Sequence, residues 1–421
     1  MMKLMKPHSK PDGMVIIGAG HCGGRAALCL RESGWDGAIT LIGDEGQLPY
    51  ERPALSKGVL AGRQTLENLH LSSRQGWDQA DISLRLKNQA LAIDPIGKSV
   101  MLNTGERIAY QRLLIATGGE ARKLNIPGAS HPRIHYLRNW NDAVRLAPLL
   151  RPGKRVVLIG GGFIGLEIAA TASQALCDVT LIEGSDRLLR RVVPAPYAER
   201  IQSLHQINNV TLSLGCQPES IESLTDGSLR VVLQNGSYID ADVVIVGIGM
   251  RPRVELAKAC GLHIDQGILV NHFLQTSEDA IYAAGDVCQF PSVHSGQLLR
   301  QETWLNAETQ GKFAALNMLG QRRPYRENPW FWSDQYDHCL QVCGDPEAGT
   351  TSLQRVLSQD GIMTFYLDAI GAIVGCSGFA LQSVLNKEMK IVRKLIEQKS
   401  IVDHAALSCS TFSLKKLLRA G

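Results

Sequence analysis

The 421-residue sequence lacks any apolar run near the roughly 18 residues that a membrane-spanning helix needs, and its ten cysteines include no Cys-x-x-Cys pair. Its net charge of +4 is small for this length, which argues against a dedicated nucleic-acid binder. Scattered cysteines in a large chain are typical of reduced thiols. We therefore expect a cytoplasmic protein that binds no nucleic acid, no membrane and no metal ion.

Two turns are rich in glycine, and each follows a short apolar run. The runs over residues 15–17 and 156–159 lead into Gly-Ala-Gly-His-Cys-Gly at residues 18–23 and Gly-Gly-Gly-Phe-Ile-Gly at residues 160–165. Both turns have the Gly-x-Gly-x-x-Gly spacing and pass into a helix-forming stretch. Glycine there permits the tight turn and the approach of a pyrophosphate, which the helix N-terminus attracts. The pattern predicts two dinucleotide sites.

A carboxylate follows each turn at the spacing of about 20 residues that a ribose-binding acid requires. The predicted strand over residues 39–42 ends at Asp44 and Glu45, and the one over residues 179–182 ends at Glu183. Glu183 favours NADH, because a carboxylate repels the 2′-phosphate of NADPH. Nearby arginines could instead accept that phosphate and leave NADPH open: Arg187, Arg190 and Arg191.

The order of these patterns predicts an α/β chain with two Rossmann-like dinucleotide-binding domains and an α+β C-terminal domain. The first nucleotide domain comprises residues 1–118 and 249–324, and the second, residues 119–248, is inserted into it. Residues 325–421 form the third domain. Its aromatic segment, residues 329–335, is predicted to be turn-like, and four strands and a basic helix over residues 381–398 follow.

Two further segments can be interpreted in two ways. Residues 48–57, Leu-Pro-Tyr-Glu-Arg-Pro-Ala-Leu-Ser-Lys, form a loop that opens into a helix near Ser56, and composition alone favours an ordinary surface connection. The strand over residues 281–286 ends in Gly-Asp, and Asp286 could merely cap the next turn before a helix over residues 303–319. Taken alone, neither segment is evidence for a site.

Together, these segments resemble the two-dinucleotide-domain flavoprotein reductases, and within them the FAD-dependent NADH:ferredoxin reductases of bacterial aromatic-ring dioxygenases and haem-thiolate monooxygenases. The resemblance spans the chain and is most specific in the proline loop, Ala-Thr-Gly at 116–118, Ala-Ala-Gly-Asp at 283–286, and Pro-Trp-Phe-Trp-Ser-Asp-Gln at 329–335. It implies a glutathione reductase-like fold and bound FAD. It also implies hydride transfer from NADH to FAD and single electrons passed to a 2Fe-2S ferredoxin.

The resemblance also assigns residues to the two cofactors. Those assigned to FAD are Gly18, Ala19, Gly20, Cys22, Gly23, Asp44, Glu45, Arg52, Lys57, Ala90, Ala116, Thr117, Gly118, Arg138, Gly285, Asp286, Glu302, Thr303, Trp304 and Trp332. Those assigned to NADH are Gly160, Gly162, Phe163, Ile164, Gly165, Glu183 and Gly249. Lys57 is expected as an electrostatic partner of the flavin edge, and Glu167 is expected near the nicotinamide, where it can pair with Lys57 and modulate it. A solvated Glu167 that only complements the helix dipole is the alternative.

Two other functions stay open. A thiol-disulfide reductase or peroxidase of this fold needs a cysteine facing the flavin, which the loop over residues 49–57 does not contain. We expect instead buried thiols, among them Cys22, Cys29, Cys339 and Cys343. An apoptosis-inducing-factor-like role with nucleic-acid contact would show salt-dependent DNA binding, against which the weak net charge argues.

Basic residues on the last helix and before the third domain either dock an acidic ferredoxin or form a solvated face: Lys387, Lys390, Arg393, Lys394, Arg322 and Arg323. The sequence leaves open a monomer or a weak homodimer. It does not identify the ferredoxin, the terminal oxygenase or the final substrate.

Overall fold

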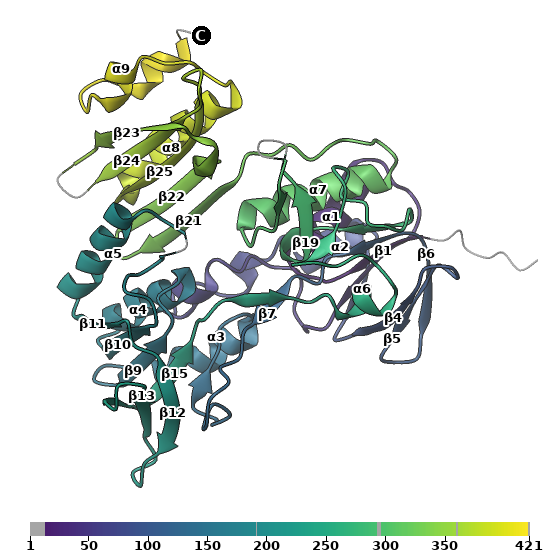
Figure 1. Ribbon diagram of the computed structural model, residues 1–421. Coiled ribbons are helices and arrows are strands. Elements are labelled where there is room, and N and C mark those ends of the chain that lie inside the picture. Colours follow the sequence, from purple (N-terminus) through teal and green to yellow (C-terminus); the bar gives the residue numbers. More distant parts are fainter. Residues whose placement is uncertain (1–12, 191, 293–295, 359–360, 420–421) are drawn as a thin grey trace, which may run out of the picture. The chain divides into compact units, whose positions relative to one another are not determined.

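The computed structural model describes residues 13–190, 192–292, 296–358 and 361–419 (Figure 1). Within these residues the chain forms two compact units. Unit 1 is drawn from Met1–Glu51, Leu69–Gly119 and Pro252–Glu327, and unit 2 from Arg52–Asn68, Glu120–Arg251 and Asn328–Gly421. Residues 52–57 of the proline loop and the C-terminal segment therefore group with the inserted nucleotide domain, while residues 48–51 of the loop belong to unit 1. The division into three functional domains stays a prediction.

Unit 1 is built on one twisted sheet. Its strands lie in the order β3 (Ser83–Leu86), β2 (Ile39–Gly43), β1 (Gly13–Ile17), β6 (Arg107–Ile115), β5 (Ser99–Leu102) and β4 (Ala90–Asp94), with β18 (Ile281–Ala283) paired to β6. The strands around β1 are parallel, as buried α/β strands are, while β4 and β5 pair antiparallel. A smaller sheet contains β17 (Ile268–Leu269), β19 (Cys288–Pro291) and β20 (Leu298–Leu299).

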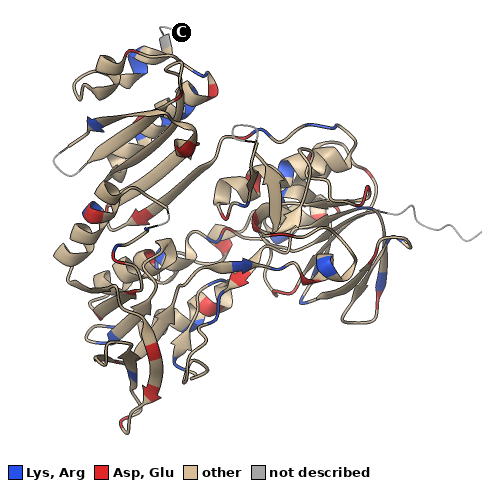
Figure 2. Ribbon diagram, viewed as in Figure 1, with Lys and Arg blue, Asp and Glu red and all other residues tan. Residues whose placement is uncertain are grey.

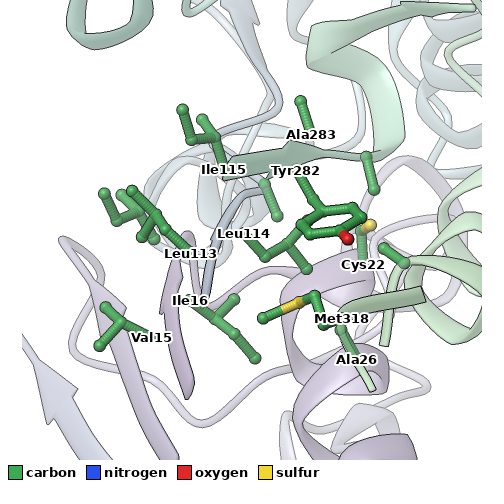
Figure 3. Packing of buried hydrophobic residues seen from close by; sticks show 14 of the residues in the cluster. Val15, Ile16, Cys22, Ala26, Leu113, Leu114, Ile115, Tyr282, Ala283 and Met318 are labelled. Carbon is green, nitrogen blue, oxygen red and sulfur yellow. The ribbon is translucent and has the colours of Figure 1, made fainter. Parts of the chain in front are cut away.

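The helices of unit 1 are α1 (His21–Glu32), α2 (Arg74–Gln79), α6 (Glu255–Ala259) and α7 (Trp304–Met318). Figure 3 shows side chains of the sheet and of α1 and α7 meeting in one buried cluster, which includes Ile16, Tyr282 and Met318. Helices α1 and α7 approach closely at Gly311, where an added Cβ would lie 2.5 Å from the carbonyl oxygen of Cys22. This packing fixes the start of α1 relative to the carboxyl ends of the strands.

The nucleotide half of unit 2 is a parallel sheet in the order β11 (Val210–Leu214), β10 (Asp178–Glu183), β9 (Arg155–Ile159), β15 (Val243–Val246) and β8 (Ile134–His135). Its helices are α3 (Trp140–Leu146), α4 (Phe163–Gln174) and α5 (Ala195–Ile207). An antiparallel sheet of β12 (Pro218–Ser223), β13 (Leu229–Leu233) and β14 (Tyr238–Ala241) is attached, and β7 (Gly119–Ala121) pairs with β16 (Met250–Pro252).

The C-terminal part of unit 2 is an antiparallel sheet. Its order is β21 (Trp330–Gln335), β22 (His338–Gly344), β25 (Ile373–Leu381), β24 (Ile362–Leu367) and β23 (Thr351–Val356), and α8 (Gln382–Glu397) and α9 (His404–Ser408) follow. The turn-like interpretation of residues 329–335 is wrong: residues 330–335 form an edge strand in register with β22. Aromatic residues fit a pleated, half-buried surface, and this property outweighs the turn composition.

Figure 2 shows basic and acidic residues interspersed over the ribbon, in keeping with the small net charge. Throughout the described ranges, no helix is both long enough and apolar enough to cross a bilayer.

Candidate functional site

The first glycine turn lies between β1 and α1 in unit 1. Gly18 has φ +112°, and a Cβ there would lie 2.1 Å from the carbonyl oxygen of Ala116. A Cβ on Gly23 would lie 1.9 Å from the carbonyl oxygen of Gly18, so both positions require glycine. Helix α1 begins after Gly20 without a side-chain cap in the described residues. Its first N–H groups are thus left for a ligand or water, which fits a pyrophosphate.

His21, the first residue of α1, was not among the site residues predicted from the sequence. Its side chain is 8% exposed, and its Nε2 lies 2.9 Å from Glu308 Oε2. Its Nδ1 is buried and has no partner among the residues that the structure describes. The ring also packs against Trp304, with centroids 5.2 Å apart. An orphaned buried nitrogen beside the glycine turn fits a site completed by a polar group from a cofactor. The sequence signal was a polar residue inside the motif.

Glu308 is a charged group near the start of α1. Burial works against its ionisation, but hydrogen bonds with His21 and Lys312 hold the pKa of Glu308 at about 2. Arg25 also approaches it, with Nε 3.4 Å from Glu308 Oε1. The carboxylate therefore keeps three basic side chains around the helix start.

The two acids after β2 are already engaged within unit 1. Asp44 is exposed and accepts a hydrogen bond from Arg253 Nη1 at 2.8 Å, while Glu45 accepts one from the Tyr50 hydroxyl at 2.7 Å. The backbone carbonyl oxygen of Arg253 also accepts a hydrogen bond from the Thr117 hydroxyl at 2.8 Å. Arg253 thus links two predicted site residues, and sequence reasoning missed it because it lies 209 positions after Asp44.

The other predicted FAD residues of unit 1 lie at ends of elements. Gly285 has φ +80°, and its N–H donates to Gln310 Oε1 at 2.8 Å. Thr303 caps α7 by accepting from the Asn306 N–H at 3.2 Å. The remaining predicted positions are Ala19 in the first turn, Cys22 in α1, Ala90 at the start of β4, Ala116 and Gly118 after β6, Asp286 after β18, Glu302 paired with Arg300, and Trp304 at the start of α7.

The second glycine turn lies between β9 and α4 in unit 2 and repeats the geometry of the first. Gly160 has φ +113°, and a Cβ there would lie 2.5 Å from the carbonyl oxygen of Gly247. A Cβ on Gly165 would lie 2.1 Å from the carbonyl oxygen of Gly160. Gly162 precedes α4 without a side-chain cap from the described part of the chain. This turn therefore also presents uncapped N–H groups that fit a dinucleotide.

Three other residues assigned to NADH lie around this turn: Phe163, Ile164 and Gly249. Ile164 is exposed, Phe163 packs against Phe331 with centroids 5.4 Å apart, and Gly249 has φ +100°.

Glu183 at the end of β10 is positioned by backbone donors. Its two oxygens accept the N–H groups of Gly161 and Ser185, each at 2.7 Å. Arg187 donates to the carbonyl oxygens of Val193 and Arg190, so its guanidinium is used within its own loop. Arg190 pairs with Asp186, and Arg191 lies outside the described residues. Arg187 and Arg190 are thus each engaged within this loop, while Glu183 is held by backbone N–H groups.

The expected pairing of Lys57 with Glu167 is present as a partly buried ion pair within unit 2. Glu167 is 5% exposed, Lys57 is 22% exposed, and Lys57 Nζ lies 3.0 Å from Glu167 Oε1. Lys57 belongs to a short π-helical turn, Leu55–Val59, and Glu167 belongs to α4. The alternative interpretation, a solvated Glu167, is wrong because the side chain is buried.

Two hydroxyl groups complete the shell around Glu167. Ser56 Oγ donates to Oε2 at 2.5 Å, and Ser333 Oγ in β21 donates to Oε1 at 2.8 Å. From the sequence, Ser56 was noted only as the start of a helix and Ser333 was given no role, although both lie inside motifs that carry the resemblance.

Three other predicted residues lie in unit 2. Arg52 donates from Nη1 to the carbonyl oxygen of Arg138 at 2.7 Å. Trp332 stacks on Trp330 with centroids 4.7 Å apart, and its Nε1 donates to Asp334 Oδ2 at 3.1 Å. The same carboxylate lies 3.9 Å from Lys57 Nζ, so Asp334 is a second acceptor near the lysine.

The cysteines provide no activated thiol in the buried core. All ten are free, and Cys22, Cys29, Cys339 and Cys343 are buried as expected. Burial raises the pKa of Cys343 to about 12 and that of Cys22 well above its usual value. Such thiols stay protonated and unreactive at neutral pH. In the described ranges, no group of three His, Cys, Asp or Glu side chains could hold a metal ion.

Comparisons with known proteins agree with this geometry. Residues 12–311 match the family model described as pyridine nucleotide-disulphide oxidoreductase, and residues 330–418 match that described as reductase C-terminal. The chain is 38% identical to the anthranilate 1,2-dioxygenase system ferredoxin–NAD(+) reductase component of Burkholderia cepacia, over 97% of this chain and 99% of the relative. It is 38% identical to putidaredoxin reductase of Pseudomonas putida, over 85% and 86%.

Among solved structures, the covalent putidaredoxin reductase–putidaredoxin complex matches with a TM-score of 0.90 and 35% identity, covering 97% of this chain and 99% of that chain.

Proposed function

The chain belongs to the pyridine nucleotide-disulphide oxidoreductase family, and from this premise we propose that it is an FAD-dependent NADH:ferredoxin reductase. The observation that carries the proposal is the repeated turn. Gly18 and Gly160 share one backbone conformation, and each turn is followed by a strand with a carboxylate at its end or directly after it. One such site suits FAD and the other suits NADH. Relatives named as ferredoxin reductases support the choice of the electron acceptor.

We assign FAD to the turn of unit 1, with Asp44 or Glu45 for the ribose and the α1 start for the pyrophosphate. The other FAD assignments are those made from the sequence, to which we add His21 because its buried Nδ1 lacks a protein partner in the described structure. The assignments of Arg52, Lys57, Arg138 and Trp332 to FAD stay those that the sequence resemblance implies. NADH is assigned to the turn at residues 160–165 with Glu183.

The division of labour follows from these groups. FAD supplies the chemistry, since it can accept a hydride and release electrons one at a time. The protein has to bind the cofactors, orient them and exclude water. Lys57 places a positive charge in a largely buried setting, and Glu167 holds that charge in position. No side chain is required as a nucleophile, which agrees with the protonated buried thiols.

The partner we propose is a 2Fe-2S ferredoxin that feeds a multicomponent oxygenase in the cytoplasm. Exposed lysines on α8 supply positive charge for an acidic partner: Lys387, Lys390 and Lys394. Arg393 is less suited to docking, because its guanidinium lies 4.5 Å over the ring of Trp330.

Anaerobic stopped-flow mixing of the purified flavoprotein with NADH or NADPH tests this function. Fast bleaching of the flavin band by NADH, slow bleaching by NADPH and rapid reoxidation by an oxidised 2Fe-2S ferredoxin are expected. Reoxidation by a disulfide or a peroxide but not by the ferredoxin would favour the thiol enzymes instead. Salt-dependent DNA binding without turnover would favour the apoptosis-inducing-factor-like role.

A further inference from the structure

A continuous chain of buried polar side chains runs from the Lys57–Glu167 pair through unit 2. Ser333 Oγ lies 2.8 Å from Glu167 Oε1, and Gln335 Nε2 donates to Ser333 Oγ at 3.3 Å. Gln335 Oε1 lies 3.0 Å from His205 Nε2, and the Tyr336 hydroxyl lies 3.3 Å from His205 Nδ1. Ser333, Gln335 and His205 are each at most 2% exposed. Buried polar groups of this kind are costly unless they are all paired.

Every donor in this chain points toward Glu167. Because Gln335 Oε1 can only accept, the proton of neutral His205 lies on Nε2, and Nδ1 accepts from Tyr336. The amide of Gln335 is then oriented so that its NH₂ faces Ser333, whose own proton is free to go to Glu167. Burial lowers the pKa of His205 to about 4, so this neutral form prevails at neutral pH.

Lys57 has two carboxylates within reach. Its Nζ lies 3.0 Å from Glu167 Oε1 and 3.9 Å from Asp334 Oδ2. Asp334 follows Ser333 in β21, and alternation along a strand directs their side chains to opposite faces. Ser333 can therefore hold Glu167 without also holding Asp334. A serine hydroxyl that fixes Oε1 of Glu167 therefore determines which of the two carboxylates keeps the ammonium group.

We propose that Ser333, Gln335 and His205 are positioning residues that hold Lys57 on Glu167 rather than on Asp334. The inference rests on the proposed function, in which Lys57 acts at the cofactor. Ser333 is the nearest member, Gln335 orients it, and His205 orients Gln335. Because α5 contributes His205, α4 contributes Glu167 and β21 contributes the other two, the lysine is positioned by the fold of unit 2 and not by its own loop alone.

The test compares Ser333→Ala with wild-type holoprotein in two measurements, the limiting rate of flavin bleaching at saturating NADH and the midpoint potential of the bound flavin. The rate should fall about tenfold, the scale of one hydrogen bond to a charged group, with little change in the apparent NADH affinity. The potential should shift in the same direction as in Glu167→Gln. Ser333→Thr keeps the hydroxyl and should restore both values.

A double-mutant cycle shows whether Ser333 acts through Glu167. The effect of Ser333→Ala should disappear in the Glu167→Gln background, because no carboxylate is left to position. Gln335→Met, which keeps the bulk but removes the amide, should give a smaller change of the same sign. The matched control is Ser377→Ala, since Ser377 is equally buried in the same sheet but lies outside the chain of contacts.

Several results would overturn the inference: unchanged rate and potential in Ser333→Ala, an effect that adds to that of Glu167→Gln, an equal effect of Ser377→Ala, or no effect of Glu167→Gln itself. The potential is measured without nucleotide. If NADH failed to bleach the wild-type flavin, the proposed function would be lost. The potentials would still decide the role of Ser333, because their measurement does not depend on NADH.

Discussion

Replacing Lys57 by methionine should destabilise the protein by about 2 kcal/mol, because it leaves the Glu167 carboxylate buried without its cation. Removing one partner of a fully buried pair costs about 3–5 kcal/mol. Two features reduce that cost here. Lys57 is 22% exposed, so solvent already screens part of the attraction, and the hydroxyls of Ser56 and Ser333 continue to donate to Glu167. Methionine keeps most of the side-chain volume, so no large cavity is added.

Urea unfolding of the holoprotein measures this difference, with an unchanged m-value as the criterion that only stability has changed. Lys387→Met is the matched control, because the same substitution at an exposed position of α8 should change the free energy of unfolding by less than about 0.5 kcal/mol. A loss in Lys57→Met no larger than that of the control would refute the claim that Glu167 depends on Lys57. In the double variant Lys57→Met, Glu167→Gln, the loss should be less than the sum of the two single losses.

Three further predictions concern other parts of the molecule. Arg355 is 3% exposed and donates to backbone carbonyl groups across residues 406–412, so Arg355→Met should cost about 3 kcal/mol and speed hydrogen exchange there. Burial lowers the pKa of His205 to about 4, below its unfolded value of about 6.5, so stability should fall as the pH drops between these values. His205→Phe should flatten that part of the urea midpoint profile, and an unchanged slope would contradict the assignment. Reversing the charges of Lys387, Lys390 and Lys394 should lower kcat/KM for the ferredoxin and weaken its salt dependence, and equal salt dependence would exclude docking at α8.

The sequence predicted the local elements well where the pattern was both local and periodic. Both strand–turn–helix units, with their terminal acids, appear where the glycine spacing placed them. The helix predicted after Thr303 is α7, and Thr303 is its capping residue. In each case the backbone conformation depends on neighbours within one turn or one strand, and these neighbours are visible in the sequence.

The prediction failed for residues 329–335. A proline, polar residues and aromatic residues read as a turn, but the segment is β21 because β22 offers a partner in register. An edge strand depends on pairing with another strand, so composition alone is a weak guide to it. The same limit explains why His21, Arg253 and Ser333 were not predicted as site residues and why Ser56 was noted only as a helix start: each acquires its role from a partner far along the chain.

By itself, the sequence determined the two dinucleotide turns, because glycine at Gly18 and Gly160 is a requirement of the backbone that no other residue meets. It also provided Lys57 and Glu167 as candidates. Only the tertiary structure decided that the pair they form is largely buried and that it is held from β21. Ser56 and Ser333 lie 111 and 166 positions from Glu167 and meet it only after folding. Burial then turns an ordinary hydroxyl or carboxylate into a positioned one.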